Sequence, residues 1–384
     1  MRLLAILAVT LLALILRLRA VNRLPIDYDE DDYLAAGQRY AAALRAGDWD
    51  RLINYDFNSE HPPLTKLAYG VSLLSLPPSF EIPERPSTDP PARVLPRPHF
   101  TYARLTAATF GTLEVLAVAF LNPLAALFLG IHTWQIKYTS QIMLEPLPSF
   151  TSALMVLAYV KWRMGNGQRR NGWLALSGVM LGLTAASKYT YCIAAFAIMA
   201  DWLWATFPAK PRTAATWARW LAPVFVWGLL SIVVFVAFDP RLWNHGPERL
   251  WQSILYHASY AESQHVKDAG YPMWQPLVWL SEPVPWHPGV FLFLLDLPIS
   301  LLALLGVRRL WHAPHLRVMA LWLTLALAFL LWWNTKWPQY ILMLTVPLAV
   351  AAAEGFKGYV VEPVAAWFQR MRAGGVRFPE AKQR

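Results

Sequence analysis

Two adjacent stretches near the start of the chain decide its fold: residues 3–18, LLAILAVTLLALILRL, and residues 27–33, DYDEDDY. The first stretch is almost entirely apolar, although it is shorter than the roughly 20 residues that a helix perpendicular to a bilayer needs. No small-x-small cleavage site precedes the arginines that follow, so we interpret it as a membrane span and not as a removable signal peptide. The second stretch places five carboxylates within six residues. Dense charge directly after an apolar run predicts the point at which a membrane helix emerges into water.

The composition of the whole chain also indicates lipid as its solvent. Of the 384 residues, 56% are hydrophobic and only 15% are charged, whereas soluble domains have about 25% charged residues. The 20 tryptophans agree with this, because tryptophan collects at membrane interfaces. The net charge of +10 would suit a nucleic-acid partner, but the basic residues cluster between apolar runs and form no stripe, so none is predicted. The single cysteine, Cys192, excludes an internal disulfide and cysteine-rich metal motifs.

About ten apolar runs predict an all-α polytopic membrane protein that forms a single domain over residues 1–384. The predicted spans lie near residues 3–18, 101–120, 123–137, 145–160, 172–187, 189–206, 217–238, 289–307, 316–333 and 339–355. The pattern leaves two large loops, residues 19–100 and 239–288, and a tail of residues 356–384. Apolar residues at helical spacing in residues 33–46 and 247–263 predict that each loop carries a helix lying on the membrane surface.

Basic clusters in the short loops predict the orientation of the chain. Each cluster is separated from the next by an even number of predicted spans, so all lie on one side, which the positive-inside rule makes cytoplasmic. Both termini are then cytoplasmic, and both large loops face the extracytoplasmic side of a plasma (inner) membrane. Arg17, Arg19 and Arg23 fall outside and oppose this assignment, but long loops such as theirs follow the rule poorly. The clusters contain Lys161, Arg163, Arg169, Arg170, Lys210, Arg212, Arg219, Arg308, Arg309, Arg317 and the basic residues of 357–384.

The acidic cluster has two interpretations from its spacing alone. Crowded carboxylates raise one another's pKa, which suits a general base or a metal site. The same residues would also serve as a solvated turn that stabilises the N-terminus of the next helix. Glu145 is predicted in a short outer loop on the same face, where an acid needs water or a partner. Glu114, inside the second predicted span, is expected to pair with Arg104 or to make another polar contact.

Two lysines and two histidines on the predicted outer side also have alternative interpretations. Lys188 and Lys336 are the only cations in their short outer loops, so either a lipid-linked phosphate offsets their cost or each anchors its span at the interface. His257 and His265 are eight residues apart, which on one helix would place them on one face and weakly suggest a metal site. Hydrogen-bonding histidines are the preferred interpretation.

Several short motifs follow one another in an order that is typical of one family of membrane enzymes. Along the chain they are Asp29-Glu30 with Tyr33, His61-Pro62-Pro63-Leu64, Arg104-Leu105, Lys137-Tyr138 leading to Glu145, Ser187-Lys188-Tyr189-Thr190, Asp239-Pro240-Arg241-Leu242-Trp243, and Lys336 with Tyr340 and Pro347. In this order the chain resembles the GT-C membrane glycosyltransferases, in particular the protein mannosyltransferase and aminoarabinose transferase-like group. It departs from that pattern at Glu145, where many relatives have Asp, and at Asn122-Pro123, which joins two spans without a basic loop.

The resemblance implies transfer of a sugar, with inversion, from a polyprenyl-phosphate donor to a hydroxyl group of a protein, lipid or glycan acceptor on the extracytoplasmic face. It implies that Asp29 takes the proton of the acceptor, and that Glu30 and Glu145 hold the acceptor or shape the field around Asp29. Lys188 and Lys336 would stabilise the leaving phosphate. The other substrate-binding residues implied are Tyr33, His61, Arg104, Lys137, Tyr189 and Tyr340. No cofactor and no catalytic metal are expected, although acids at this density are compatible with a divalent ion.

Two other classes of protein fit parts of the pattern. A transporter or flippase would also contain broken helices, but the charges here concentrate in the outer loops and not in the middle of the bilayer. A non-catalytic membrane scaffold would share the spans without needing the ordered motifs. Within the acidic cluster, the resemblance selects Asp29, and Asp27, Asp31 and Asp32 are expected to be solvated or to cap the following helix.

Overall fold

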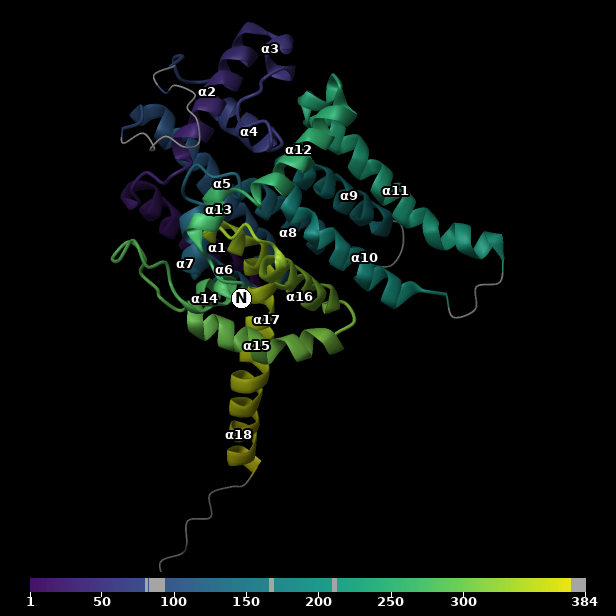
Figure 1. The fold of residues 1–384 in the computed structure, drawn as a ribbon. Helices are drawn as coiled ribbons and strands as arrows, with labels where there is room; N and C mark the ends of the chain where they lie inside the picture. The colour runs from purple at the N-terminus through teal and green to yellow at the C-terminus, as the bar shows by residue number, and fades with distance from the viewer. Residues whose placement is uncertain (80–81, 83–93, 166–168, 209–212, 374–384) are drawn as a thin grey trace, which may run out of the picture.

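The computed structural model is helical, and it describes residues 1–79, 82, 94–165, 169–208 and 213–373 (Figure 1). Within these ranges no strand occurs, in agreement with the predicted all-α fold. The helices are α1 (Arg2–Arg23), α2 (Glu30–Ala46), α3 (Trp49–Ile53), α4 (Leu64–Ser72), α5 (Arg97–Leu121), α6 (Pro123–Ile131), α7 (Thr133–Tyr138), α8 (Pro146–Met164), α9 (Arg169–Ser187), α10 (Ile193–Thr206), α11 (Ala214–Phe238), α12 (Gly246–Tyr260), α13 (Gln264–Ala269), α14 (Gln275–Ser281), α15 (Asp296–His312), α16 (Arg317–Trp332), α17 (Leu342–Phe356) and α18 (Glu362–Ala373). Short turns, η1 (Tyr189–Cys192), η2 (Pro240–Trp243), η3 (Pro338–Ile341) and η4 (Lys357–Val361), precede or join several of them.

The N-terminal helices form an antiparallel core. The guanidinium of Arg2 donates to the carbonyl oxygen of Phe120 at 2.7 Å, so the start of α1 lies beside the end of α5. Beyond the other end of α1, Asp27 forms an ion pair with Lys137 at 2.9 Å. The segment between these contacts therefore runs back along α1 as α6 and α7. It is broken at His132, whose backbone is extended, so the predicted span 123–137 consists of two short helices.

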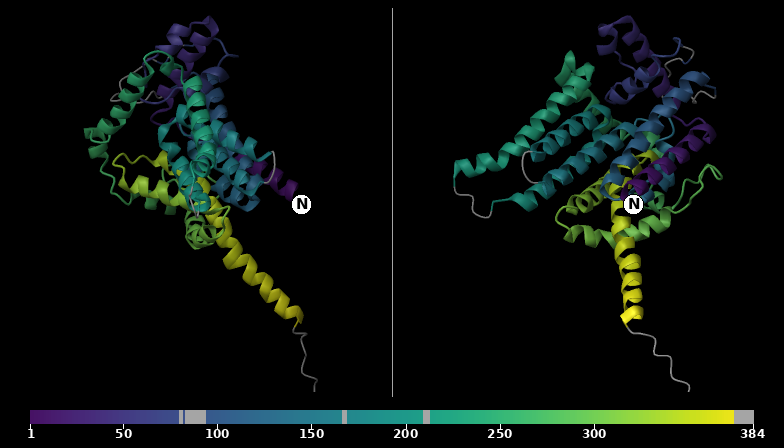
Figure 2. Two further views of the ribbon diagram at one scale, coloured as in Figure 1. Left: turned by 90° about the vertical axis from the view of Figure 1, so that its right-hand side faces the viewer. Right: turned by 180° about the vertical axis from the view of Figure 1, so that it is seen from behind.

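Two further groups of helices extend from this core. α8, α9, α10 and α11 lie side by side and project away from it (Figure 1 and Figure 2). In this group α8 packs against α9, and α9 packs against α11. α15, α16 and α17 form the other group, and α10 packs against α16, which joins the two groups. α18 continues beyond α17 and extends away from the rest of the molecule (Figure 2).

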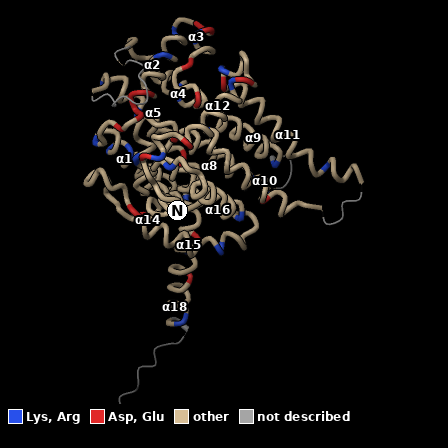
Figure 3. Tube along the Cα trace, viewed as in Figure 1, with Lys and Arg blue, Asp and Glu red and all other residues tan. Residues whose placement is uncertain are grey.

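The basic clusters lie at the end of the bundle that is far from the acidic segment. Arg163, near the end of α8, pairs with Asp201 of α10 at 2.8 Å. Trp204 of α10 contacts Trp311 at the end of α15, and Arg317 at the start of α16 lies over the Trp204 ring. Figure 3 shows basic residues near α15 and α16 and toward the end of α18. Which side of a membrane this end faces stays a prediction, and Lys210, Arg212 and residues 374–384 lie outside the described residues.

The described helices confirm a membrane protein but not the predicted number of spans. Among them, four are long and apolar enough to cross a bilayer, Arg2–Arg23, Arg97–Leu121, Ala214–Phe238 and Pro338–Met371, and Arg317–Trp332 is apolar but shorter. The predicted bounds 289–307 are wrong, because Arg19 donates to the carbonyl oxygens of Gly289 and Val290 in a loop and α15 begins only at Asp296. Within the predicted tail, residues 357–373 are helical and form η4 and α18.

Both predicted loop helices are present, with different bounds. Residues 33–46 belong to α2, which packs so closely on α4 that a Cβ atom at Gly70 would lie 2.9 Å from the Cβ of Tyr40. Residues 247–263 correspond to α12, which ends at Tyr260. His265 lies on α13, so the idea that His257 and His265 share one helical face is wrong, because the helix ends between them.

The packing of α15 on α17 depends on two glycines. A Cβ atom at Gly306 would lie 1.8 Å from the carbonyl oxygen of Ala351, and one at Gly355 would lie 2.0 Å from that of Leu302. We expect Gly306→Ala to force the helices apart and to lower the free energy of unfolding by about 1–3 kcal/mol. The measurement is the thermal midpoint of the purified protein in detergent. Gly228→Ala is the control, since no atom of the described residues lies within 4 Å of a Cβ atom at that position. Equal midpoints for both variants would contradict this account.

Candidate active site

A cavity with two adjoining lobes lies next to the acidic segment. One lobe has a volume of about 430 Å³ and contains Lys137. The other has a volume of about 360 Å³ and contains Lys188. We call them the Lys137 lobe and the Lys188 lobe. Both are lined by Tyr28, Asp29, Tyr260, His265, Trp337 and Gln339, so the lobes meet at these residues.

Asp29 is the one carboxylate that lines both lobes among the described residues. It precedes α2, and its carbonyl oxygen accepts the first hydrogen bond of that helix. Burial, together with the negative charges of Glu145, Asp27 and Asp32, raises the pKa of Asp29 to about 7. The positive charge of Lys188 opposes this shift. A carboxylate whose pKa lies near neutrality has the strength that a general base needs.

Glu30 and Arg104 form a buried ion pair that holds the acidic segment against α5. Arg104 Nε donates to Glu30 Oε1 at 2.8 Å, and Nη2 donates to Oε2 at 2.5 Å. Two backbone N–H groups also donate to the Glu30 carboxylate. Arg104 donates as well to the carbonyl oxygens of Val21, Leu24 and Pro25. Neither Glu30 nor Arg104 lines a lobe, which favours a positioning role for both over the catalytic and substrate-binding roles that the resemblance implies.

Lys188 places a positive charge in its lobe. The backbone leaves α9 here in an extended conformation, and the Lys188 ammonium donates to the carboxylate of Glu145. The same ammonium lies 4.8 Å from the ring centroid of Tyr340. Since an ammonium has three donors, Lys188 can hold Glu145 and still donate to an anion in the lobe. Glu145 is almost fully buried and does not line either lobe, so it acts through Lys188 and through its charge near Asp29.

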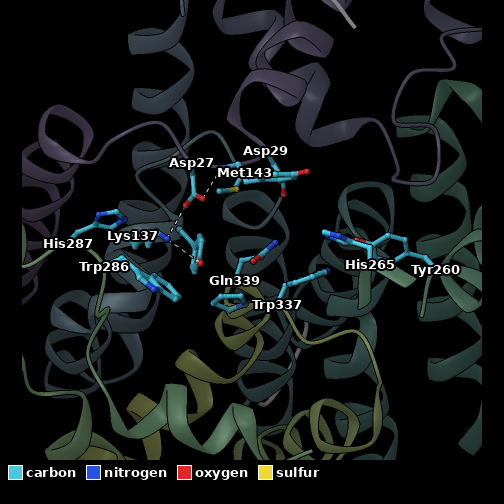
Figure 4. Close-up of a pocket in the computed structure, with 13 residues that line it drawn as sticks. Asp27, Asp29, Lys137, Met143, Tyr260, His265, Trp286, His287, Trp337 and Gln339 are labelled. Carbon is cyan, nitrogen blue, oxygen red and sulfur yellow. Dashed lines mark hydrogen bonds and ion pairs between the residues drawn. The ribbon is translucent and has the colours of Figure 1, made fainter. Parts of the chain in front are cut away.

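Lys137 supplies the positive charge of the other lobe. Its ammonium lies 2.9 Å from Asp27 and over the rings of Tyr138 and Trp286, at 4.6 Å and 4.9 Å from their centroids. In Figure 4, Asp27 and Asp29 enter this lobe from one side, and Trp337 and Gln339 enter from the opposite side. Aromatic walls with a few placed polar groups are typical of pockets that bind small molecules.

His61 is positioned by contacts between the two large loops. His257 Nε2 and Ser253 Oγ both donate to the carbonyl oxygen of Glu60, at 3.1 Å and 2.5 Å. Arg241 donates to the preceding carbonyl group. The rings of His61 and His257 are 5.1 Å apart, and burial lowers the pKa of both, that of His257 to about 4. Both imidazoles are therefore neutral at physiological pH. Within the described part of the chain, no three His, Cys, Asp or Glu side chains are grouped so that they could hold a metal ion.

The predicted tyrosines occupy two different positions. Tyr33 and Tyr340 line the Lys188 lobe, and each offers a hydroxyl group that can donate a hydrogen bond. Burial raises the pKa of the Tyr33 hydroxyl group, so it stays protonated at neutral pH. Tyr189 lies behind that lobe, with its ring 6.5 Å from the ring of His257. It therefore supports His257 and does not face the cavity.

Lys336 lies outside both lobes. Its ammonium donates to the carbonyl oxygen of Trp333 at 2.5 Å, and it lines a separate pocket. The adjacent residue, Trp337, reaches both lobes instead. The structure thus brings Lys188 and Tyr340 together but places Lys336 elsewhere.

Two other residues of the acidic cluster are not solvated. Asp31 is fully buried and Asp32 is 7% exposed. Asp31 Oδ1 accepts a hydrogen bond from the backbone N–H of Asp32 at 3.0 Å, and Asp32 lines the Lys188 lobe. The solvated alternative is wrong for Asp31 and Asp32, because α2 packs against α4 and α5. Both residues lie in the first turn of α2, the place that the helix-capping alternative gives them.

A second polar group lies inside the bundle. Glu114 does not pair with Arg104 but accepts hydrogen bonds from Ser149, at 2.7 Å, and from Gln135. Arg17, predicted outside, is fully buried within α1. The expectation that charges concentrate in the outer loops is therefore wrong for Arg17, which is buried in the interior that also holds Glu114. For Glu114, the predicted polar contact inside the span is present.

Sequence reasoning missed most of the aromatic wall of the cavity. Two of these aromatic residues had a signal nearby, because Tyr28 lies within the acidic stretch 27–33 and Trp337 follows the predicted residue Lys336. The cavity residues that were not singled out are Tyr28, Asn58, Glu60, Met143, Tyr256, Tyr260, Trp286, His287, Trp337, Pro338 and Gln339.

Comparisons with known proteins identify the fold. No family model and no curated protein matches the sequence. The solved structure of ArnT from Cupriavidus metallidurans bound to undecaprenyl phosphate matches with a TM-score of 0.61 and 16% identity, over 97% of this chain and 62% of that chain. The archaeal oligosaccharyltransferase AglB from Archaeoglobus fulgidus, in complex with an inhibitory peptide and a dolichol-phosphate, matches with a TM-score of 0.55 and 14% identity, over 98% of this chain and 52% of that chain. This chain thus spans less than two thirds of the length of either protein, and its fold is that of the GT-C membrane glycosyltransferases.

Proposed function

We propose that this chain transfers a sugar from a polyprenyl-phosphate donor to an acceptor hydroxyl group, with Asp29 as the general base. The observation that carries the proposal is the position of Asp29, which lines both lobes of the cavity and has its pKa raised to about 7. A reaction between two substrates needs both of them to reach one proton acceptor, and adjoining lobes allow this.

The charges of the Lys188 lobe support a phosphate-bearing donor. Lys188 is paired with one carboxylate and retains donors for an anion, and Tyr33 and Tyr340 offer hydroxyl donors beside it. Charge-assisted hydrogen bonds of this kind bind phosphate strongly. The ArnT structure of the same fold holds undecaprenyl phosphate, which supports a polyprenyl phosphate as the carrier.

The proposed step is an in-line displacement at the anomeric carbon. The acceptor oxygen attacks that carbon and gives its proton to the Asp29 carboxylate. The bond between the anomeric carbon and the phosphate oxygen breaks, and its electron pair leaves with the polyprenyl phosphate. The phosphate is already a stable anion, so the step needs no general acid, and Lys188 stabilises the added negative charge. Attack opposite the leaving group inverts the configuration of the sugar.

We expect Lys188→Ala to weaken binding of undecaprenyl phosphate at least tenfold, because a hydrogen bond to a charged group contributes about 1.5–3 kcal/mol. The measurement is a titration of the purified protein with undecaprenyl phosphate, followed by native mass spectrometry. Lys267→Ala, which removes an exposed lysine of α13, is the control and should bind as the unmodified protein does.

Two further variants make this test decisive. Lys188→Ala/Glu145→Gln removes the carboxylate that the single change would strand, so it separates loss of binding from loss of folding. Lys336→Ala should have a smaller effect than Lys188→Ala, since Lys336 lies outside both lobes. Unchanged affinity in both variants that lack Lys188 would contradict the proposed donor site.

A further inference from the structure

A third large cavity lies at the opposite end of the bundle from Asp29. It has a volume of about 560 Å³ and runs between α9 and α11 beside the end of α8. Lys188 follows the last residue of α9, whereas this groove adjoins the beginning of that 19-residue helix. At 1.5 Å per residue the two sites are roughly 25 Å apart along α9. The groove is therefore separate from the proposed active site.

The shape of the groove follows from two glycines in α9. A Cβ atom at Gly178 would lie 3.0 Å from the carbonyl oxygen of Trp227, and one at Gly182 would lie 2.6 Å from that of Ser231. The Ser231 hydroxyl also donates to the carbonyl oxygen of Gly178 at 3.0 Å. α9 and α11 thus touch at this level, which closes one end of the groove. Towards their N-termini the helices leave room, and Pro223 of α11 lines the space.

The open end of the groove is positively charged. Arg170 and Arg219 both line it, and both are exposed. The Arg170 guanidinium lies 4.7 Å from the ring centroid of Trp162, and this contact restricts the conformations of the arginine side chain. α9 and α11 both begin near this end, and the N-termini of helices favour anions. Among the described residues that line the groove, none is acidic.

The rest of the groove is apolar and has the length of one lipid leaflet. The lining residues of α11 run from Arg219 to Leu230, which is roughly 16 Å along a helix. Half of a bilayer core is about 15 Å deep. The neighbouring face of α11 is strongly exposed, since Phe225 is 69% exposed and Val226 is 57% exposed. α11 is also one of the helices that are long and apolar enough to cross a bilayer. A ligand that fits has one anionic group and an apolar chain of about that length.

We propose that this groove binds an anionic glycerophospholipid of the leaflet opposite the active site. Its phosphate group lies between Arg170 and Arg219, and one acyl chain follows Leu174, Val226 and Leu230. The site is distinct from the polyprenyl-phosphate site, because it lies at the other end of α9 and ends where α9 and α11 touch.

The test is lipid retention by the full chain. We expect native mass spectrometry of the protein from nanodiscs that contain equal amounts of phosphatidylglycerol and phosphatidylcholine to show retained phosphatidylglycerol. Arg170→Gln/Arg219→Gln should reduce that occupancy at least fivefold, and Ala222→Trp, which fills the groove without changing charge, should reduce it as well. Arg308→Gln/Arg317→Gln removes the same charge at the same end of the bundle, outside the groove, and should retain the lipid.

Three outcomes would overturn the proposal. The first is equal retention by the groove variants and the unmodified protein. The second is equal loss in the two double variants, which would mean that net charge and not the groove retains the lipid. The third is displacement of the retained lipid by undecaprenyl phosphate at equal concentration, which would make the groove a second carrier site. Lipid retention is measured without any sugar transfer, so failure of the proposed lipid site and failure of the proposed activity can be told apart. Donor turnover is measured separately.

Discussion

Asp29→Asn is expected to reduce sugar transfer by about 10²- to 10⁴-fold, the usual contribution of a general base. Asparagine keeps the size of the side chain but cannot accept the proton. The variant should remain folded. Burial raises the pKa of Asp29 from 3.8 to about 7, so the folded state binds this proton more tightly and stability falls as the pH rises from about 4 to 7. A neutral side chain at this position avoids that loss.

The measurement for Asp29→Asn is the release of undecaprenyl phosphate from undecaprenyl-phosphate-linked hexoses and pentoses by membranes that contain the protein. Asp50→Asn is the control, because Asp50 is exposed on α3 and lines neither lobe. A thermal midpoint for each purified variant shows whether it is folded. Full turnover by Asp29→Asn, or loss only in Asp27→Asn, would move the base to another carboxylate.

Arg104→Ala is expected to be strongly destabilising, because it leaves the carboxylate of Glu30 buried without its partner. Breaking a buried ion pair in this way costs about 3–5 kcal/mol. Three backbone carbonyl groups, one at the end of α1 and two directly after it, lose their donor as well. The expected result is a much lower thermal midpoint and a lower yield of folded protein. Arg97→Ala, an exposed change at the start of the same helix, is the matched control.

The same pair of residues distinguishes positioning from catalysis. Glu30→Gln/Arg104→Met removes both charges, and its thermal midpoint should be higher than that of Arg104→Ala, because no lone charge stays buried. A midpoint of Arg104→Ala equal to that of the unmodified protein would show that the pair does not hold the acidic segment. Turnover that falls in Glu30→Gln/Arg104→Met without any change of midpoint would instead favour a direct role in catalysis.

Much of the fold could be predicted because it depends on local patterns. Apolar runs identify α1, α5 and α11, and helical spacing identifies α2 and α12. The breaks could not be predicted in this way. The extended backbone at His132 and the late start of α15 depend on contacts with residues more than 100 positions away. In two of these contacts, the Thr133 N–H donates to the Asp296 carboxylate and Arg19 donates to the Gly289 carbonyl oxygen.

The candidate site also contains some residues that local sequence motifs predict and others that only the folded chain brings together. Motif order selects Asp29, Lys137 and Lys188, which line the cavity. It also selects Lys336, which does not, because a spacing to Tyr340 does not determine which way each side chain points. Trp286 has no motif around it and is brought to Lys137 only by the folding of the second large loop. Ion pairs could not be predicted from the sequence either. The sequence offers Glu114 as a partner for Arg104, but in the structure Arg104 pairs with Glu30.

The pH dependence of donor turnover tests the role of Asp29 most directly. Only the deprotonated carboxylate can accept the proton, and burial raises its pKa to about 7. Turnover at limiting donor should therefore rise up to tenfold per pH unit below 7 and become constant above it. Asp29→Asn should remove this dependence from whatever turnover remains. A profile that is flat from pH 5 to 8 in the unmodified protein, or that keeps its midpoint near 7 in Asp29→Asn, would contradict the assignment of Asp29 as the base.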